Sequence, residues 1–249
     1  MFDASKEIDG IVNWIREWFE RNGPKASAVI GLSGGKDSSI VATLLVRALG
    51  KDRVVGVMMP NGRQADINDS IAIANHLGIK TYTVNIESSY NAFLDTLQES
   101  ASDIEITKDT KINLAPRLRM STLYAIAQSL PNGGRVANTC NASEDYVGYS
   151  TKYGDAAGDF SPCANYTVTE MLQIGDALKV PKELVHKKPS DGLSGMSDED
   201  KLGFTYASLD DYIINGVCDD EKLKERFDYL HKINLHKLEV IPTYKRGNA

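Results

Sequence analysis

The run SGGKDS at residues 33–38 follows an apolar segment at 26–32 and opens a helical pattern. Its two glycines let the backbone turn tightly and approach a ligand closely. Free amides at the start of a helix, with the positive end of the helix dipole, favour a phosphate there. Asp37 would repel a phosphate by itself, and it is best explained by a Mg²⁺ ion that bridges to one. The run therefore predicts a nucleotide-phosphate loop with a metal site beside it.

Two common phosphate loops do not fit this run. From Gly31 the sequence reads GLSGGKD, which is one residue short of GxxxxGK, and Asp37 stands where Ser or Thr follows the lysine of a Walker A loop. The GxGxxG dinucleotide pattern is absent as well. The alternative is a purely structural role, in which these residues form a glycine-rich turn between a strand and a helix, capped by Asp37. The complete SGGxDS pattern at the end of the first strand favours the functional interpretation.

Apolar runs and helical periodicities alternate along the chain, and they predict the elements that must position this loop. Because strands alternate with helices, we expect an α/β fold with a Rossmann-like open parallel sheet and helices on both faces. The carboxyl ends of such strands share one edge, where open α/β sheets bind ligands. Strands are predicted at 26–32, 54–59, 80–84 and 135–137, and helices at 7–20, 37–49, 69–77, 114–130, 208–215 and 219–235.

The first predicted helix is amphipathic, with apolar residues at helical spacing and two tryptophans, Trp14 and Trp18, near its apolar face. Docking onto the core is the simpler interpretation, and a dimer contact is the alternative. Two polar segments without clear periodicity, 138–168 and 186–201, are longer than ordinary connections, and such loops are usually functional or disordered. We interpret 186–201 as a lid that excludes water, with Gly192 and Gly195 as hinges.

Composition limits the class of protein. The chain has 249 residues and 42% hydrophobic content, which suits a single domain over 1–249. Its net charge of -6 argues against a protein that coats nucleic acid. Three cysteines without CxxC spacing indicate reduced thiols rather than disulfides or a zinc site. With no secretory pattern and no stretch of about 20 apolar residues, we expect a cytoplasmic protein with no membrane partner.

The SGGxDS pattern resembles the signature of the N-type ATP pyrophosphatases, which cleave ATP between the α- and β-phosphates and adenylate a substrate oxygen. Within that superfamily, four further segments resemble the NAD synthetases. They are NLAPRLRM at 113–120, the segment 139–159 with its TKYGD, the segment 188–206 with KPSDGL and LGFTY, and the His-Lys pair at 236–237. Together with the loop they run from about residue 26 to 242 in the order of the family.

This resemblance implies an adenine nucleotide alpha hydrolase-like fold and a ligase that forms a carbon–nitrogen bond. ATP would adenylate the carboxylate of deamido-NAD (nicotinic acid adenine dinucleotide), and ammonia would then displace AMP to give NAD. ATP is the co-substrate, Mg²⁺ the metal, and a homodimer the expected assembly. Because the first strand begins at residue 26, we expect no glutaminase domain upstream, and we expect free ammonia as the nitrogen source.

The resemblance also assigns roles to individual residues. Asp155 of TKYGD would act in catalysis near the ammonia, together with Asp37, and Asp37 and Glu144 would bind Mg²⁺. The residues expected to bind deamido-NAD, partly at a dimer interface, are Arg117, Lys152, Asp159, His236 and Lys237. The residues expected to bind ATP are Gly31, Leu32, Ser33, Gly34, Gly35, Lys36, Asp37, Ser38, Thr139 and Ser190.

Some positions carry a plainer alternative. Arg117 and Arg119 are two residues apart on a helix, so one of them is expected to be an ordinary surface arginine. Asp145 is expected to be solvated. Many members of the family have an ATP-binding lysine where this chain has Val168, and Lys187 or Lys188 are the candidates to replace its charge.

Two other functions remain open at this point. One is another N-type ATP pyrophosphatase, such as a GMP synthetase-like or tRNA-thiolating enzyme, although the chain has neither CxxC cysteines nor a basic composition. The other is a nucleotide-binding sensor without catalysis, which Val168 favours and the retained acidic residues Asp37, Glu144 and Asp155 oppose.

Overall fold

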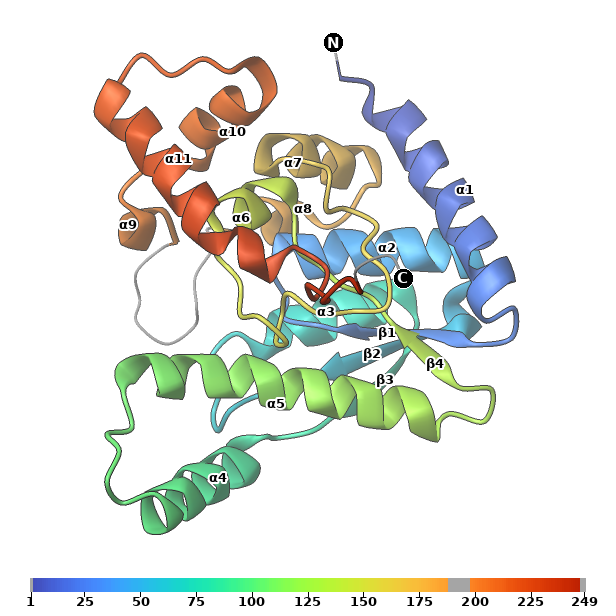
Figure 1. Ribbon diagram of the computed structural model, residues 1–249. Helices are drawn as coiled ribbons and strands as arrows, with labels where there is room; N and C mark the ends of the chain where they lie inside the picture. The colour runs from blue at the N-terminus through green and yellow to red at the C-terminus, as the bar shows by residue number, and fades with distance from the viewer. Residues whose placement is uncertain (1, 188–197, 247–249) are drawn as a thin grey trace.

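The structure is a computed structural model that describes residues 2–187 and 198–246. Its centre is a parallel sheet of four strands in the order β3-β2-β1-β4 (Figure 1). All four predicted strands are present, and the α/β fold with an open parallel sheet is confirmed. Their bounds are β1 Ser27–Gly31, β2 Val54–Met58, β3 Lys80–Thr83 and β4 Gly134–Val136.

Strand β1 forms the middle of the core because it is apolar on both sides. Ala28 and Ile30 belong to the apolar cluster on one face of the sheet, and Val29 belongs to the cluster on the other. All three are fully buried. A strand covered on both faces is expected to be a continuous apolar run rather than an alternating pattern, and that is how the sequence at 26–32 appears.

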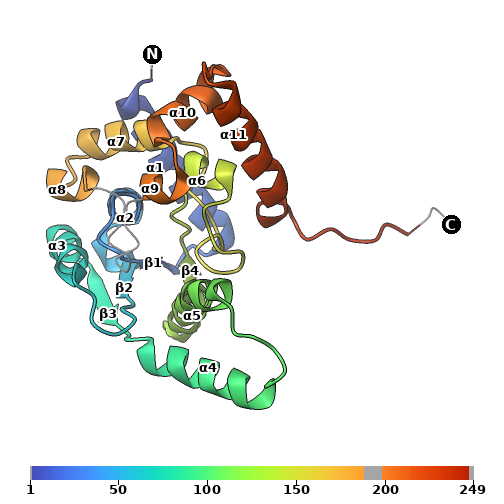
Figure 2. The same cartoon turned by 90° about the vertical axis from the view of Figure 1, so that its left-hand side faces the viewer.

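Helices cover both faces of the sheet, as Figure 2 shows by viewing it along its edge. On one face lie α2 (Lys36–Leu49) and α3 (Ile67–Leu77), and α1, α7 and α8 complete the same apolar cluster. On the other face α5 (Lys108–Ser129) packs against β1 and β4, and α4 (Glu87–Ser100) packs against α5. The bounds of the remaining elements here are α1 Ala4–Asn22, η1 Lys51–Arg53, α7 Val168–Ala177 and α8 Lys182–Val185.

Helix α1 docks onto the core, which was the simpler of the two interpretations of its pattern. Asp3 caps its first turn, and its apolar stripe, which includes Ile15 and Phe19, is buried. The ring of Trp18 stacks on Phe160 with centroids 4.7 Å apart. Stacked aromatic pairs contribute beyond their buried area, and this pair attaches the segment after β4 to α1.

A second helical cluster lies beyond the carboxyl edge of the sheet. Its apolar core includes Val147, Leu209 and Phe227, all buried. The cluster lies next to the start of α2, because Asn141 at its beginning donates a hydrogen bond to Asp37. Its elements are α6 Ala142–Val147, α9 Asp198–Leu202, α10 Tyr206–Asn215, α11 Glu221–Asn234 and the 3₁₀ turn η2 Leu235–Lys237.

The strand order creates a switch point between β1 and β4. The chain proceeds outward from β1 to β2 and β3, and then returns through α4 and α5 to β4 on the opposite side of β1. The segments that leave β1 and β4 therefore diverge, and such a crevice is where open α/β sheets bind ligands. Residues 33–38 follow β1 and Thr139 follows β4, so the candidate residues meet there. Among the described residues, no helix has the length and apolarity that a membrane span requires.

Candidate functional site

The backbone of the loop after β1 requires glycine at one position. Gly34 has a φ of +76°, a backbone conformation that residues with a side chain rarely adopt. A Cβ atom there would lie 2.6 Å from the Cβ of Asp69 and 2.8 Å from the backbone nitrogen of Ser70. Gly34 therefore lets the loop pack directly against the start of α3.

Hydroxyl groups stabilise the loop from within. The Oγ atoms of Ser33 and Ser38 are 3.0 Å apart, and the amide of Gly35 donates to Ser33 Oγ over 3.2 Å. Ser38 and Ser39 both donate to the carbonyl of Gly35, at 3.2 and 2.8 Å. Gly35 is the N-cap of α2 and offers no side-chain cap. The first amides of a helix have no intrahelical acceptor, so this helix start is suited to an anion.

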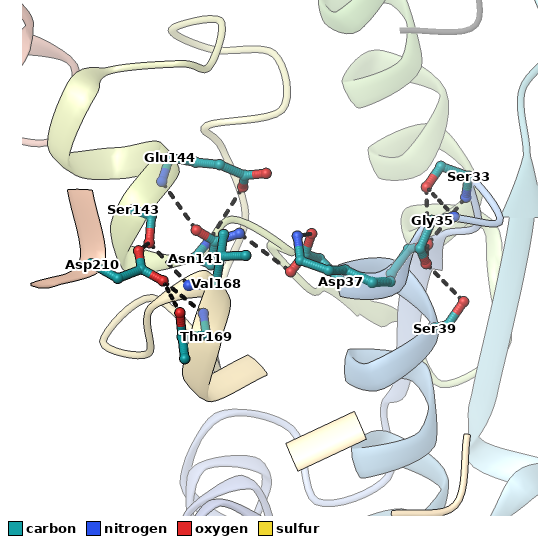
Figure 3. Close-up of polar contacts among 12 residues, drawn as sticks. Ser33, Gly35, Asp37, Ser39, Asn141, Ser143, Glu144, Val168, Thr169 and Asp210 are labelled. Atoms are coloured by element: carbon teal, nitrogen blue, oxygen red, sulfur yellow. Dashed lines mark hydrogen bonds and ion pairs between the residues drawn. The ribbon is translucent and has the colours of Figure 1, made fainter. Parts of the chain in front are cut away.

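Asn141 connects the two carboxylates expected to hold the metal (Figure 3). Its Nδ2 donates to Asp37 Oδ1 over 3.2 Å. Its backbone amide donates to Glu144 Oε2 over 3.3 Å, and its Oδ1 accepts from the Glu144 amide over 3.0 Å, which is a capping box at the start of α6. Asp37 Oδ2 is 2.7 Å from Lys36 Nζ.

The electrostatics of this pair fit a divalent cation. Burial raises the pKa of Glu144, the nearby charge of Asp37 raises it further, and Lys36 opposes the shift. Two carboxylates that disfavour each other's charge are stabilised by a hard cation between them. Among the described residues, no three His, Cys, Asp or Glu side chains cluster as a metal site. The remaining oxygen ligands of a Mg²⁺ ion would thus be phosphates and waters.

Asp155 lies in a tight turn that other motif residues hold in place. Its Oδ1 accepts from the amide of Thr151 over 3.0 Å, and its carbonyl accepts from Asn138 Nδ2 over 2.8 Å. Thr151 Oγ1 in turn donates to Asn113 Oδ1 over 2.7 Å, which joins the NLAPRLRM and TKYGD segments. Asp155 is open to solvent, but neighbouring atoms crowd its carboxylate, and this loss of hydration raises its pKa against the hydrogen bonds from Thr151.

The C-terminal residues expected to bind the substrate contact this same turn. Lys237 Nζ donates to the carbonyls of Gly148 and Ser150, at 2.7 and 3.0 Å. Lys152 Nζ donates to the carbonyl of His236, and Arg117 Nε donates to the carbonyl of Lys152 over 3.3 Å. The structure thus brings together Arg117, Lys152, His236 and Lys237 around the turn that carries Asp155. In these contacts both lysines stabilise the backbone.

Asp159 is engaged at the end of β4. Its Oδ2 accepts from the amide of Val136 over 2.7 Å, and its Oδ1 accepts from the hydroxyl of Tyr124 over 3.2 Å. Burial and the charge of Asp159 raise the pKa of Tyr124 to about 12. Asp159 also lines a cavity of about 560 Å³, with Tyr146, His231 and Lys237 among the other lining residues. Thr139, two residues past the bridge at Ala137, is half-buried at the same edge.

Three expectations about charged residues can be compared with the structure. Asp145 lines the cavity instead of being fully solvated, and burial raises its pKa to about 6. Arg117 is exposed, whereas Arg119 is half-buried and donates to the carbonyl of Met59 over 3.0 Å, so the two arginines do differ. Lys187, a candidate to replace the charge missing at Val168, pairs with two carboxylates at the start of α3. Its Nζ is 2.7 Å from Asp66 Oδ2 and 2.6 Å from Asp69 Oδ2.

Other expected residues lie elsewhere in the fold. Val168 is buried as the first residue of α7. Ser190, Lys188 and most of the predicted lid, including Gly192 and Gly195, lie outside the described residues.

A buried polar network behind the carboxylates was not predicted from the sequence. Asp210 is 2% exposed and accepts from Ser143 Oγ over 2.5 Å and from Thr169, through its amide at 2.7 Å and its hydroxyl at 2.6 Å. Figure 3 shows this network beside Asn141 and Glu144. It ties α10 to the starts of α6 and α7. The capping pattern Asn-x-x-Glu at 141–144 was the available signal for Asn141, and Thr-x-x-Glu at 167–170 the signal for α7.

The fold and this site define an α/β protein with a strand-to-helix loop that is suited to an anion and lies beside two carboxylates. Within that class the chain belongs to the NAD synthase family, whose family model matches residues 7–247. The family comprises ligases that form a carbon–nitrogen bond, so the expected family and enzyme class are confirmed.

Similar proteins cover nearly the whole chain. An NH(3)-dependent NAD(+) synthetase of Alkaliphilus metalliredigens is 37% identical over 247 residues, which cover 96% of this chain and 98% of the relative. The NH(3)-dependent NAD(+) synthetase of Pyrococcus furiosus is 40% identical over 244 residues, covering 92% of each chain.

Solved structures also match over nearly the whole chain. The NMN synthetase of Francisella tularensis matches with a TM-score of 0.88 and 34% identity, covering 99% of this chain and 100% of that one. An NH3-dependent NAD synthetase of Campylobacter jejuni, in complex with the nitrate ion, matches with a TM-score of 0.78 and 26% identity over 98% of this chain and 100% of that one.

Proposed function

We propose that this protein converts deamido-NAD to NAD with ATP and ammonia. The observation that carries the proposal is the uncapped glycine loop after β1, which faces the paired carboxylates Asp37 and Glu144 at the switch point of the sheet. Relatives named NH(3)-dependent NAD(+) synthetases support the choice of substrate and nitrogen source.

The chemistry explains why ATP is needed. A carboxylate does not react with ammonia near neutral pH, because its oxygen is a poor leaving group. The nicotinate carboxylate attacks the α-phosphate of ATP, and pyrophosphate leaves toward the amides at the start of α2. Asp37 and Glu144 would hold Mg²⁺, which neutralises phosphate charge when bound. Ammonia then attacks the acyl-adenylate, forms the amide bond and releases AMP.

Asp155 is suited to the second step. Ammonium must lose a proton before it can attack, and a carboxylate with a raised pKa is a better proton acceptor than an ordinary one. The hydrogen bond from the Thr151 amide to Oδ1 helps to fix the orientation of the carboxylate. The hydrogen bonds from Lys237 to the carbonyls of Gly148 and Ser150 hold the start of the same turn in place.

The remaining roles extend this proposal. We assign the loop residues, Thr139 and Ser190 to ATP, and Arg117, Lys152, Asp159, His236 and Lys237 to deamido-NAD. The single domain would use free ammonia and work in the cytoplasm, where its free cysteines stay reduced.

A homodimer is part of the same proposal. Large apolar side chains are exposed on α4 and around the start of α5: Phe93 is 50%, Ile104 48% and Ile112 55% exposed. Exposed apolar groups of this kind are typical of surfaces that a partner covers. Sedimentation equilibrium should give twice the mass of 27.3 kDa, and a monomer at micromolar concentration would contradict the assignment.

One assay tests the proposed reaction. The protein is incubated with ATP, Mg²⁺, ammonium and deamido-NAD, and the products are separated by chromatography. NAD and AMP should form in equal amounts. ADP in place of AMP would exclude adenylation, and ATP cleavage without NAD would remove the proposed substrate.

A second candidate substrate is the mononucleotide. The Francisella tularensis structure, which matches over nearly the full length of both chains, is named an NMN synthetase. The corresponding reaction would amidate nicotinic acid mononucleotide through the same acyl-adenylate. Comparing kcat/KM for the mononucleotide and the dinucleotide decides between them, because only an enzyme that binds the adenylyl half should prefer deamido-NAD by tenfold or more.

A further inference from the structure

Lys36 is a buried lysine at the centre of the site. It is the first residue of α2, yet it is only 6% exposed. An ammonium group is costly to bury unless an anion accompanies it. The anion here is Asp37, whose Oδ2 lies 2.7 Å from Lys36 Nζ.

The same ammonium also acts on Glu144. The charge of Lys36 stabilises the ionised form of Glu144, against the effects of burial and of Asp37. In Figure 3 the side chain of Glu144 extends from α6 toward the start of α2, and Asn141 lies between Glu144 and Asp37. The ammonium of Lys36, in contact with Asp37, therefore lies beside the pair of carboxylates to which the metal is assigned.

We propose that Lys36 is a resident counter-cation: its ammonium stands in for the metal at Asp37 and Glu144 until nucleotide binds, and then moves to a phosphate. The inference rests on the proposed function, because it requires ATP at the loop. A divalent ion that coordinates Asp37 would repel an ammonium 2.7 Å from the same carboxylate, so the two cannot share that oxygen. The flexible four-carbon stem of lysine lets its charge move without any change in the backbone.

This exchange couples the two ligands. In the nucleotide-free protein an incoming cation has to displace Lys36, so free divalent ions should bind weakly. A bound triphosphate offers Lys36 another anion and opens the carboxylates to the metal. Reciprocity then requires that metal and nucleotide strengthen each other's binding by the same factor.

Lys36→Met tests the exchange by binding alone. Mn²⁺ affinity is measured without nucleotide by electron paramagnetic resonance, and affinity for α,β-methylene-ATP is measured by calorimetry. The variant should bind Mn²⁺ about tenfold more tightly than the unaltered protein, because the competing charge is gone. It should bind α,β-methylene-ATP about tenfold more weakly, because a charge-assisted phosphate contact is lost. A merely structural lysine would weaken both.

Control variants locate the effect. Lys80→Met removes the same charge from an exposed position on β3 and should change neither affinity. Adding Asp37→Asn to Lys36→Met should abolish the gain in Mn²⁺ affinity. If Lys36→Met does not fold, as judged by circular dichroism, Lys36→Gln provides the same measurement with a polar head group.

The outcomes separate this inference from the proposed function. Unchanged or weaker Mn²⁺ binding by the Lys36 variant, with normal nucleotide binding by the unaltered protein, overturns the exchange alone. Failure of the unaltered protein to bind α,β-methylene-ATP overturns the nucleotide site and with it both proposals.

Discussion

Gly34→Ala tests whether the shape of the loop after β1 controls nucleotide binding. The substitution adds one methyl group at a φ of +76°, a conformation that costs an L-residue roughly 1–2 kcal/mol. The new Cβ would also meet the Cβ of Asp69 at 2.6 Å and the nitrogen of Ser70 at 2.8 Å. Because the nitrogen belongs to the backbone, the loop itself has to move. Overpacking of this kind costs roughly a further 1–3 kcal/mol.

Gly133→Ala is the matched control. Gly133 has a φ of +69° in the turn before β4, and a Cβ there would meet no atom within 4 Å. It therefore reports the cost of backbone strain without the collision. We expect urea unfolding to give a loss of about 1–2 kcal/mol for Gly133→Ala and a loss larger by about 1–3 kcal/mol for Gly34→Ala.

Nucleotide binding provides the second readout. Calorimetry with α,β-methylene-ATP should find near-normal affinity for Gly133→Ala and a loss of at least tenfold for Gly34→Ala, because the displaced amides no longer converge on the phosphates. Equal destabilisation by the two substitutions, with nucleotide affinity retained in both, would refute the argument that the contact with α3 sets the loop.

Three further outcomes follow from the site. Asp155→Asn should slow NAD formation at least about a hundredfold yet preserve pyrophosphate exchange into ATP, since only the ammonia step needs its proton acceptor; loss of both would assign it to adenylation. Tyr124→Phe should cost about 1 kcal/mol in urea unfolding at pH 8. Because the folded pKa of Tyr124 is about 12, above its ordinary value near 10, this difference should shrink as the pH rises from 10 to 12, and a constant difference would exclude the hydrogen bond to Asp159. Asn141→Ser keeps a helix cap but loses the donor to the Asp37 carboxylate, so it should raise the Mg²⁺ concentration needed for half-maximal activity. The control Thr167→Ala breaks the capping box of α7 and should lower only stability. If both variants need the same Mg²⁺ concentration, Asn141 does not position the metal site.

The parts of the fold that the sequence predicts well are those with a strong local signal. Each of the four strands lies within a residue or two of its prediction, because buried parallel strands appear as continuous apolar runs between turns. Helix α4 was missed: it buries no residue, so no apolar stripe marked it. Helix α5 begins at Lys108, six residues earlier than predicted, because Thr107 caps it there and its first turns carry little apolar pattern.

The site residues that could be predicted are likewise those with a local sequence signal. Gly34 and Asp37 could be found from their spacing, since the loop is a single local unit. Asn141 could not be paired with Asp37 in this way, because the two are separated by 104 positions and meet only through the strand order. Asp210 escaped notice for a similar reason: its partners Ser143 and Thr169 come from different helices, and only burial distinguishes it from a surface aspartate.

The clamp between η2 and the turn that carries Asp155 links the end of α11 to the proposed ammonia step. The carbonyls of Gly148 and Ser150 are held by Lys237, and Asn234 Nδ2 donates to the carbonyl of Val147 over 3.1 Å. Because these contacts come from α11 and η2, local unfolding of that segment would release the turn while the sheet and its loop stay folded. Amide formation would then be lost at a lower denaturant concentration than nucleotide binding.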